Sequence, residues 1–249
     1  MKSTKCNIYC ETNVGKKRKN NEDQTGFLNT SEFQVLLVAD GMGGHLKGEV
    51  ASDIVKTVIL GLLENEPKPK NDRKARALLK KVIKKANSEI YKLSTHKDDY
   101  YGMGTTLVMA FVLDDETYII NCGDSRAYAY KNDKLNLLTV DQTCVEYLYK
   151  LGVLSKEEIK THPRKHVLMN ALGIDSTVNY DISKIDNSSY DYLLLCSDGL
   201  TNMIEKEDIQ NIIKENKDMG VEEITHKLIN TALENGGADN VSVCLMEVK

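Results

Sequence analysis

Short apolar runs rich in β-branched residues recur along the chain and are bounded by turn-forming residues. Their length and boundaries predict β-strands, several of them buried. The runs cover residues 34–39, 105–113, 117–122, 192–196 and 241–248. The strands come in groups with helices inserted between them, rather than in strict alternation with helices. This order favours antiparallel sheets with helices packed on the outside.

Other stretches carry apolar residues at helical spacing. Residues 50–62 follow a glycine-rich loop, and residues 75–93 form a second apolar stripe. Asn71 or Asp72 can cap the start of that second helix, just after the break at Pro67-Lys-Pro69. Two amphipathic helices are predicted near residues 206–214 and 221–233. A polar helical stretch without strand character covers residues 141–162.

The helix predicted at residues 75–93 also has a dense basic face. Its members are Arg73, Lys74, Arg76, Lys80, Lys81, Lys84 and Lys85. Such a face can contact nucleic acid or an acidic partner, but a solvated face opposite a core stripe is the commoner arrangement. The formal net charge is -4, with 37 acidic and 33 basic residues, so no whole-protein field attracts nucleic acid or an anionic membrane.

Length and composition fit one soluble domain over residues 1–249. The 41% of hydrophobic residues can form a substantial core, and 28% of residues are charged. No apolar run approaches the roughly 20 residues that span a bilayer, and the first nine residues lack the apolar stretch of a signal peptide. We therefore expect a cytoplasmic protein.

Six cysteines are present, and none forms a C-x-x-C pair. They are Cys6, Cys10, Cys122, Cys144, Cys196 and Cys244, most of them inside apolar runs. We interpret them as buried free thiols rather than as disulfides or zinc ligands. Cys6 and Cys10 could form a redox pair, but strand alternation alone places both on one face.

Acidic residues repeatedly stand where a predicted strand begins or ends. They are Glu22, Asp23, Asp40, Asp124, Asp198 and Asp239. A single Asp-Gly or Gly-Asp dipeptide is an ordinary turn. Several carboxylates brought to one end of a sheet, however, repel one another unless cations neutralise them. Hard oxygen ligands select Mg²⁺ or Mn²⁺ rather than zinc, so the pattern predicts a two-metal site.

Six motifs in order make this reading specific. They are Arg18-x-x-x-Glu22-Asp23, Asp40-Gly-Met-Gly-Gly-His45, Gly102-Met-Gly-Thr-Thr106, Gly123-Asp-Ser-Arg126, Ser197-Asp-Gly199 and Asp239-Asn240. Together they resemble the metal-dependent (2C-type, or PPM) protein serine/threonine phosphatases, and most of all their compact bacterial members. The matching motifs run from residue 15 to residue 243, so the resemblance covers nearly the whole chain.

The resemblance implies an α+β fold, an α-β-β-α sandwich of two antiparallel sheets flanked by helices, with a dimetal cleft at one end. It implies that Asp40 bridges two Mn²⁺ or Mg²⁺ ions and that the Gly41 carbonyl ligates one of them. Asp198 and Asp239 complete the shell of the other ion. The remaining implied roles are water-mediated metal contacts for Glu22 and Asp23, a third and weaker ion at Asp124, and phosphate binding by Arg18.

The implied reaction is hydrolysis of phosphoserine and phosphothreonine in proteins by in-line attack of a metal-bridging water, without a phosphoenzyme. Two cations lower the pKa of such a water and neutralise charge on the transferring group. A guanidinium suits phosphate because it donates two hydrogen bonds in a fork. The resemblance also implies a monomer that opposes a bacterial-type serine/threonine kinase.

Some positions depart from the family pattern. Met42 stands where larger eukaryotic relatives have a histidine proposed to protonate the leaving group, and we expect His45 to shape the glycine turn instead. Asp141-Gln-Thr143 replaces the more usual Asp-His-Ser. Residues 145–165 correspond to the variable flap beside the cleft, which either selects substrates or is a surface subdomain with little role in turnover.

Two other functions remain open at this point. A pseudophosphatase would bind partners through the same surface without turnover, although it would typically have lost metal carboxylates. A nucleic-acid binder would use the basic face at residues 80–85, but the acidic balance and the absence of interleaved aromatic residues weigh against it. The loop at residues 41–44 lacks both the P-loop ending and the Rossmann spacing, so we discount nucleotide binding.

Overall fold

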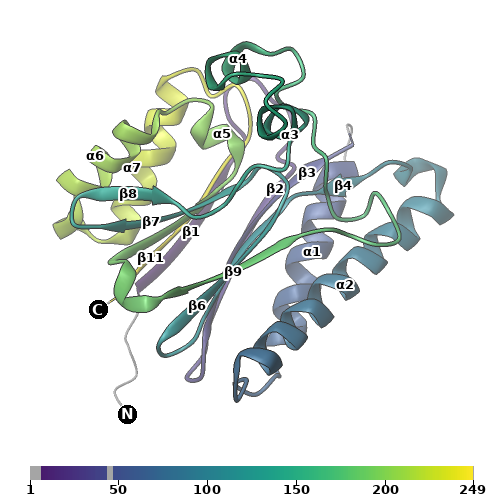
Figure 1. Ribbon diagram of the computed structural model, residues 1–249, viewed down its shortest axis with the longest axis horizontal. Helices are drawn as coiled ribbons and strands as arrows, with labels where there is room; N and C mark the ends of the chain where they lie inside the picture. Colours follow the sequence, from purple (N-terminus) through teal and green to yellow (C-terminus); the bar gives the residue numbers. More distant parts are fainter. Residues whose placement is uncertain (1–6, 44–46, 249) are drawn as a thin grey trace.

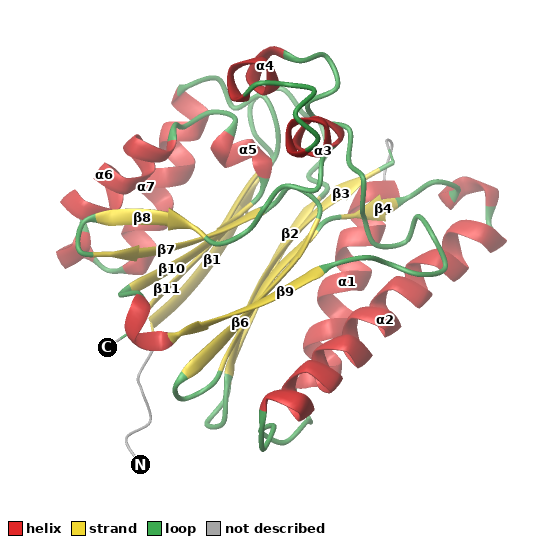
Figure 2. Ribbon diagram, viewed as in Figure 1, coloured by secondary structure: helices red, strands yellow, loops and turns green. Residues whose placement is uncertain are grey.

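The computed structural model describes residues 7–43 and 47–248, and the account below concerns these residues. Two antiparallel sheets pack face to face, and helices cover both outer faces (Figures 1 and 2). This is the α-β-β-α sandwich that the sequence predicts. His45, with its expected role in the glycine turn, and Cys6, with its possible pairing, lie outside the described residues.

The first sheet holds the first and the last strand of the described residues. Its order is β1 (Asn7–Asn13), β11 (Val241–Glu247), β10 (Tyr192–Cys196), β7 (Arg126–Lys131) and β8 (Lys134–Leu137). β1 pairs with β11 in antiparallel register from Asn7 opposite Glu247 to Asn13 opposite Val241. The segment before Arg18 and the segment after Asp239 therefore lie side by side.

The second sheet places the acidic strand ends together. Its order is β2 (Asp23–Asn29), β3 (Gln34–Met42), β5 (Leu107–Val112), β6 (Glu116–Cys122) and β9 (Asp181–Asp186), and β4 (Gly104–Thr105) pairs with the end of β3. Side chains of β3 alternate strictly, as the period of a strand requires. Leu36 and Val38 point into the space between the sheets, whereas Leu37 and Ala39 point toward the helices.

Helices form the outer layers. α1 (Lys47–Leu63) and α2 (Asp72–His96) cover the second sheet, and α6 (Lys206–Glu215) and α7 (Val221–Glu234) cover the first. α3 (Cys144–Lys150), α4 (Lys156–Thr161) and α5 (Asp198–Thr201) gather at one end of the sandwich (Figure 1). Single-turn 3₁₀ helices lie at Asp98–Tyr100, Asn187–Ser189 and Lys217–Met219. The buried side chains form three apolar clusters, one between the sheets and one under each helical layer.

The predicted elements are confirmed, but no strand was predicted at the inner, buried strand β7 or at β8 and β9. β10 has the predicted bounds, and Asn71 is the N-cap of α2 because its side chain accepts a hydrogen bond from the Lys74 amide. The sequence analysis missed β8 and β9, which carry mostly exposed polar residues. In the described part of the chain no helix is long and apolar enough to cross a membrane, and a cytoplasmic location stays a prediction.

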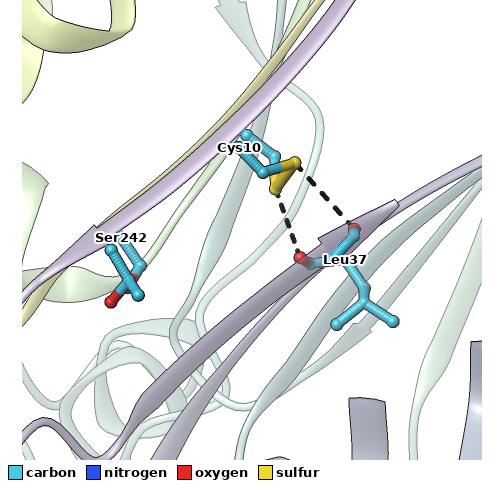
Figure 3. The surroundings of a disulfide bond; sticks show 6 residues. Cys10, Leu37 and Ser242 are labelled. Carbon is cyan, nitrogen blue, oxygen red and sulfur yellow. Dashed lines mark hydrogen bonds between the residues drawn. A yellow bond between two sulfur atoms is a disulfide. The ribbon is translucent and has the colours of Figure 1, made fainter. Parts of the chain in front are cut away.

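The interpretation of all cysteines as free thiols is wrong for one pair. Cys10 and Cys244 are linked by a disulfide, and their Cα atoms lie 4.0 Å apart (Figure 3). The two cysteines face each other across the paired strands β1 and β11, and they are 234 residues apart in the sequence. The Cys244 sulfur lies 3.3 Å from the Leu37 carbonyl oxygen of the facing sheet. Cys122 and Cys196 are buried free thiols, as expected, and Cys144 is free and half-buried.

The cluster between the sheets provides a test of the packing. Leu195 of β10 is fully buried there, so Leu195→Ala should lower the free energy of unfolding by about 2–5 kcal/mol. Leu137 of β8 is 44% exposed, and Leu137→Ala should cost less than about 0.5 kcal/mol. Urea denaturation followed by circular dichroism measures both values, and equal losses in the two variants would contradict the assignment of this core.

Candidate metal centre

The predicted acidic residues converge at one end of the sandwich. Asp23 is the first residue of β2 and stands directly opposite Asp40 near the end of β3. Side chains at directly opposed positions of antiparallel strands have Cβ atoms about 5 Å apart. Asp198 begins α5 just after β10, and Asp239 just precedes β11, so the other sheet brings its own carboxylates to the same end.

The pKa values of these carboxylates reflect their burial and their closeness to one another. Burial raises the pKa of Asp40 well above its ordinary value, and the negative charges of Asp23 and Asp198 raise it further. Burial and the charge of Asp198 likewise raise the pKa of Asp124 to about 7. Each shift has the same physical cause, because a second anion in a poorly hydrated site disfavours ionisation of the first.

Asp23 is the most isolated of these acids. It is 1% exposed, burial raises its pKa to about 7, and neither of its carboxylate oxygens has a hydrogen-bond partner. The Ser197 and Ser242 hydroxyls lie near it and oppose the shift of its pKa, but the Ser242 hydroxyl donates to Thr12 and the Ser197 oxygen accepts from the Ser242 amide. A buried carboxylate without donors is costly unless it is protonated or close to a cation.

The Gly-Thr-Thr and Gly-Asp-Ser motifs fix the backbone of Asp40. The Asp40 amide donates to the Thr106 hydroxyl at 2.9 Å, and its carbonyl accepts from the Thr106 amide at 2.8 Å and the Thr105 hydroxyl at 3.0 Å. The Thr106 and Ser125 hydroxyls are 2.7 Å apart and hydrogen-bonded. These residues position the acid, a role that the sequence analysis did not assign to them.

Two glycines at the site lack a side chain for a steric reason. A Cβ atom on Gly41 would lie 2.1 Å from the Gly48 carbonyl oxygen at the start of α1. A Cβ atom on Gly199 would lie 1.9 Å from the Asn240 carbonyl oxygen. Both distances are far below van der Waals contact. The backbone at these two positions can approach the Gly48 and Asn240 carbonyls only because both residues are glycine.

Arg18 lies at the rim of the carboxylates. Its Nη2 atom donates to Asp239 Oδ2 at 2.7 Å, and half of its side chain is exposed. Asn240 holds the Arg18 loop in place, because its side chain donates to the carbonyls of Val14 and Asn20 and accepts from the Glu22 amide. The sequence motif contained Asn240, but only the structure shows this function.

The flap segment adds a residue that sequence reasoning missed. Nδ1 of His166 lies 3.7 Å from Asp198 Oδ2, and this interaction raises the pKa of His166. Asn202 donates to the same Asp198 oxygen at 3.0 Å. The sequence analysis placed the end of the flap at residue 165 and so did not include this histidine. His162 Nδ1 accepts a hydrogen bond from the Arg164 amide within the flap.

Asp141 has a structural role at the base of the flap. It accepts a bidentate interaction from Arg126, with distances of 2.9, 3.2 and 2.6 Å. This carboxylate raises the pKa of the largely buried Arg126. Gln142, which stands where relatives more often have histidine, donates to Asp181 and accepts from the Gly123 amide. Both residues join the base of the flap to the turn between β6 and β7, which carries Asp124.

The carboxylates are neighbours rather than a closed ligand set. Among the described residues, no three Asp, Glu, His or Cys side chains are close enough together to ligate one ion. A cavity of about 720 Å³ lies elsewhere, between α1 and α2, where Ile54, Val58 and Leu93 form part of its wall. It contains none of the predicted site residues.

Comparison with known proteins identifies the family. A family model described as protein phosphatase 2C matches residues 13–239. This chain belongs to the protein phosphatase 2C family. The "serine/threonine phosphatase stp" of Listeria innocua is 37% identical over 237 residues, which cover 95% of this chain and 93% of the relative. The protein phosphatase PhpP of Streptococcus pneumoniae is 33% identical over 238 residues and covers 95% of each chain.

Solved structures of this family share the fold. The crystal structure of the serine/threonine phosphatase Stp1 from Staphylococcus aureus matches with a TM-score of 0.92 and 34% identity, over 99% of this chain and 96% of that one. The catalytic domain of the phosphatase PstP, solved in complex with two manganese ions, matches with a TM-score of 0.84 and 31% identity, over 98% of each chain.

The raised pKa values predict how the metal-free protein responds to pH. Asp23 and Asp124 retain protons up to about pH 7 when folded, but only up to about pH 4 when unfolded. Between these two pH values the folded state binds more protons than the unfolded state. The contribution of these groups to the free energy of unfolding therefore falls as the pH rises through this range. Calorimetry with a chelator present should show a lower Tm at about pH 8 than at about pH 5.

The variant Asp40→Asn isolates the contribution of the cluster, because it removes one carboxylate from the group. Its Tm should fall less than that of the wild type over the same pH range, and adding Mn²⁺ should raise the wild-type Tm most at the higher pH. A wild-type Tm that falls no more with pH than that of the variant would contradict the electrostatic coupling.

Proposed function

We propose that this chain hydrolyses phosphoserine and phosphothreonine in proteins with two Mn²⁺ or Mg²⁺ ions held by the carboxylates at the end of the sandwich. The observation that carries the proposal is the opposed pair of the buried Asp23 and the half-buried Asp40, which two sheets surround with three further acids. Membership of the protein phosphatase 2C family supports the reaction, and the manganese-containing PstP structure supports the choice of ion.

The donor set fits hard divalent cations. Every acid in the cluster offers oxygen ligands, and the two oxygens of Asp23 are buried without a hydrogen-bond donor. In this proposal the residues that would hold the two ions are Asp40, the Gly41 carbonyl, Asp198 and Asp239. Glu22 and Asp23 act through waters. Asp124, which faces Asp198, would hold a third and weaker ion.

Bound cations would supply Lewis-acid activation of a water and neutralise charge on the phosphoryl group. The chain itself binds and orients the substrate. Arg18 pairs with Asp239, and half of its side chain is exposed, so its guanidinium would also be able to donate hydrogen bonds to phosphate oxygens. Met42 has no exchangeable proton, so it takes no part in protonating the leaving alkoxide.

The alternatives from the sequence gain no support. The acidic residues that a pseudophosphatase typically loses are all retained. On the basic face of α2, Arg76, Lys81 and Lys85 pair with acidic side chains. That pairing supports the interpretation of a solvated helix face over a nucleic-acid site. We propose that the substrates include a cognate serine/threonine kinase and that the protein acts as a monomer.

The variant Asp40→Asn tests the metal centre. It should lower Mn²⁺-dependent phosphate release from a phosphothreonine peptide by at least about a hundredfold, because the charge that holds both ions is removed. Isothermal titration calorimetry should show weaker Mn²⁺ binding by the same variant. Wild-type activity that survives a chelator, or variant activity that survives with unchanged metal binding, would defeat the two-metal mechanism.

The variant Arg18→Ala tests phosphate binding. Loss of a charge-assisted, forked contact should lower kcat/KM by about tenfold to a hundredfold, the size expected for one or two hydrogen bonds to a charged group. Mn²⁺ affinity should change much less, since Arg18 is not a ligand. Arg18→Lys restores charge without the fork and should recover only part of the activity. Full activity in Arg18→Ala would contradict this role.

A further inference from the structure

Two exposed basic segments lie beside the carboxylate cluster. The first is the loop between β1 and β2, with Lys16, Lys17 and Lys19 around Arg18. The second is in the flap, where Arg164 and Lys165 directly precede His166. We call these five residues, Lys16, Lys17, Lys19, Arg164 and Lys165, the basic rim. The two segments are far apart in sequence, so their charges were not recognisable as one feature.

Each segment is attached to a different carboxylate of the same site. The first is held by the pair between Arg18 and Asp239, and the Lys16 amide donates to the Gly237 carbonyl just before β11. The second approaches Asp198 through His166. Asp198 and Asp239 both raise the pKa of Asp40, so the two segments flank one centre. Figure 1 shows α3 and α4, which precede the second segment, at the end of the sandwich where α5 begins.

The rim charges are unpaired. Among the described residues, no carboxylate forms a salt bridge with any of the five, whereas several basic side chains of α2 have acidic partners. The protein as a whole has a net charge of -4, so a positive rim is a local departure from the average. Unpaired cations beside a cleft attract anionic segments of a ligand, and low salt strengthens the effect.

We propose that the basic rim docks acidic residues that flank the phosphorylated serine or threonine, and so gives the enzyme a preference for acidic phosphopeptides. This inference rests on the proposed function and names a substrate class for the same site. The flanking negative charge can come from Asp and Glu or from a second phosphoresidue. Both would pair with the lysine ammonium groups and the Arg164 guanidinium.

The test compares phosphothreonine peptides of one length that carry acidic, neutral or basic flanks, together with a doubly phosphorylated peptide. The acidic peptide should have a kcat/KM about threefold to tenfold above the neutral one, as expected for a few exposed ion pairs, and the basic peptide should fall below it. The difference should lie mainly in KM and shrink at about 0.5 M salt. If only the doubly phosphorylated peptide has a higher kcat/KM than the neutral one, the basic rim binds a second phosphate rather than acidic side chains.

Two double variants locate the effect. Lys17→Ala/Lys19→Ala and Arg164→Ala/Lys165→Ala should each reduce the ratio of acidic to neutral kcat/KM. The matched control is Lys80→Ala/Lys84→Ala on α2, which removes the same charge from exposed, unpaired lysines of an outer helix and should leave the ratio unchanged. Thermal unfolding verifies that the variants fold.

Equal kcat/KM for all three flanks in the wild type would overturn the inference, as would a preference that survives in both rim variants. Either result leaves the proposed function intact, because the neutral peptide is still hydrolysed. Absence of hydrolysis of every peptide with Mn²⁺ present would instead reject the proposed function.

Discussion

The repulsion between Asp23 and Asp40 is the constraint on which the rest of this structure depends. Two strands of one sheet place these acids directly opposite each other, with Asp23 buried and Asp40 half-buried. Such an arrangement is unfavourable for the polypeptide alone, because buried like charges are poorly screened. The scaffold tolerates it because Asp40 is fixed through its backbone, by Thr105 and Thr106, and not through its carboxylate. The carboxylate oxygens thus remain available to a ligand from outside the chain.

The sequence predicted the fold well where burial alone decides it. β3, β5, β6, β10 and β11 are nearly continuous apolar runs, and their acids follow from strand-end positions. β9 could not be found in this way, because only Ile182 and Ile185 of this edge strand are apolar and its conformation depends on pairing with β6. The disulfide was missed for a related reason. Cys10 and Cys244 meet only through a pairing between the two ends of the chain.

The sequence predicted which acidic residues form the site, but not the hydrogen bonds and ion pairs that connect them to other segments. Motif order singled out the carboxylates and Arg18, whereas local sequence contains no sign that Asn240 holds the Arg18 loop or that His166 approaches Asp198. Those contacts depend on how three distant segments are oriented at the end of the sandwich. Side-chain orientation of this kind is set by tertiary packing, which periodicity and motif spacing do not encode.

The pairing of β1 with β11 also has a consequence for biosynthesis. Contacts between residues more than two hundred positions apart form late, since a long loop must close before they contribute any stability. A nascent chain that has not yet released β11 from the ribosome has no neighbour for β1, no Asp239 beside Arg18 and no Asn240 to hold the intervening loop. The centre can therefore assemble only after β11 has been translated.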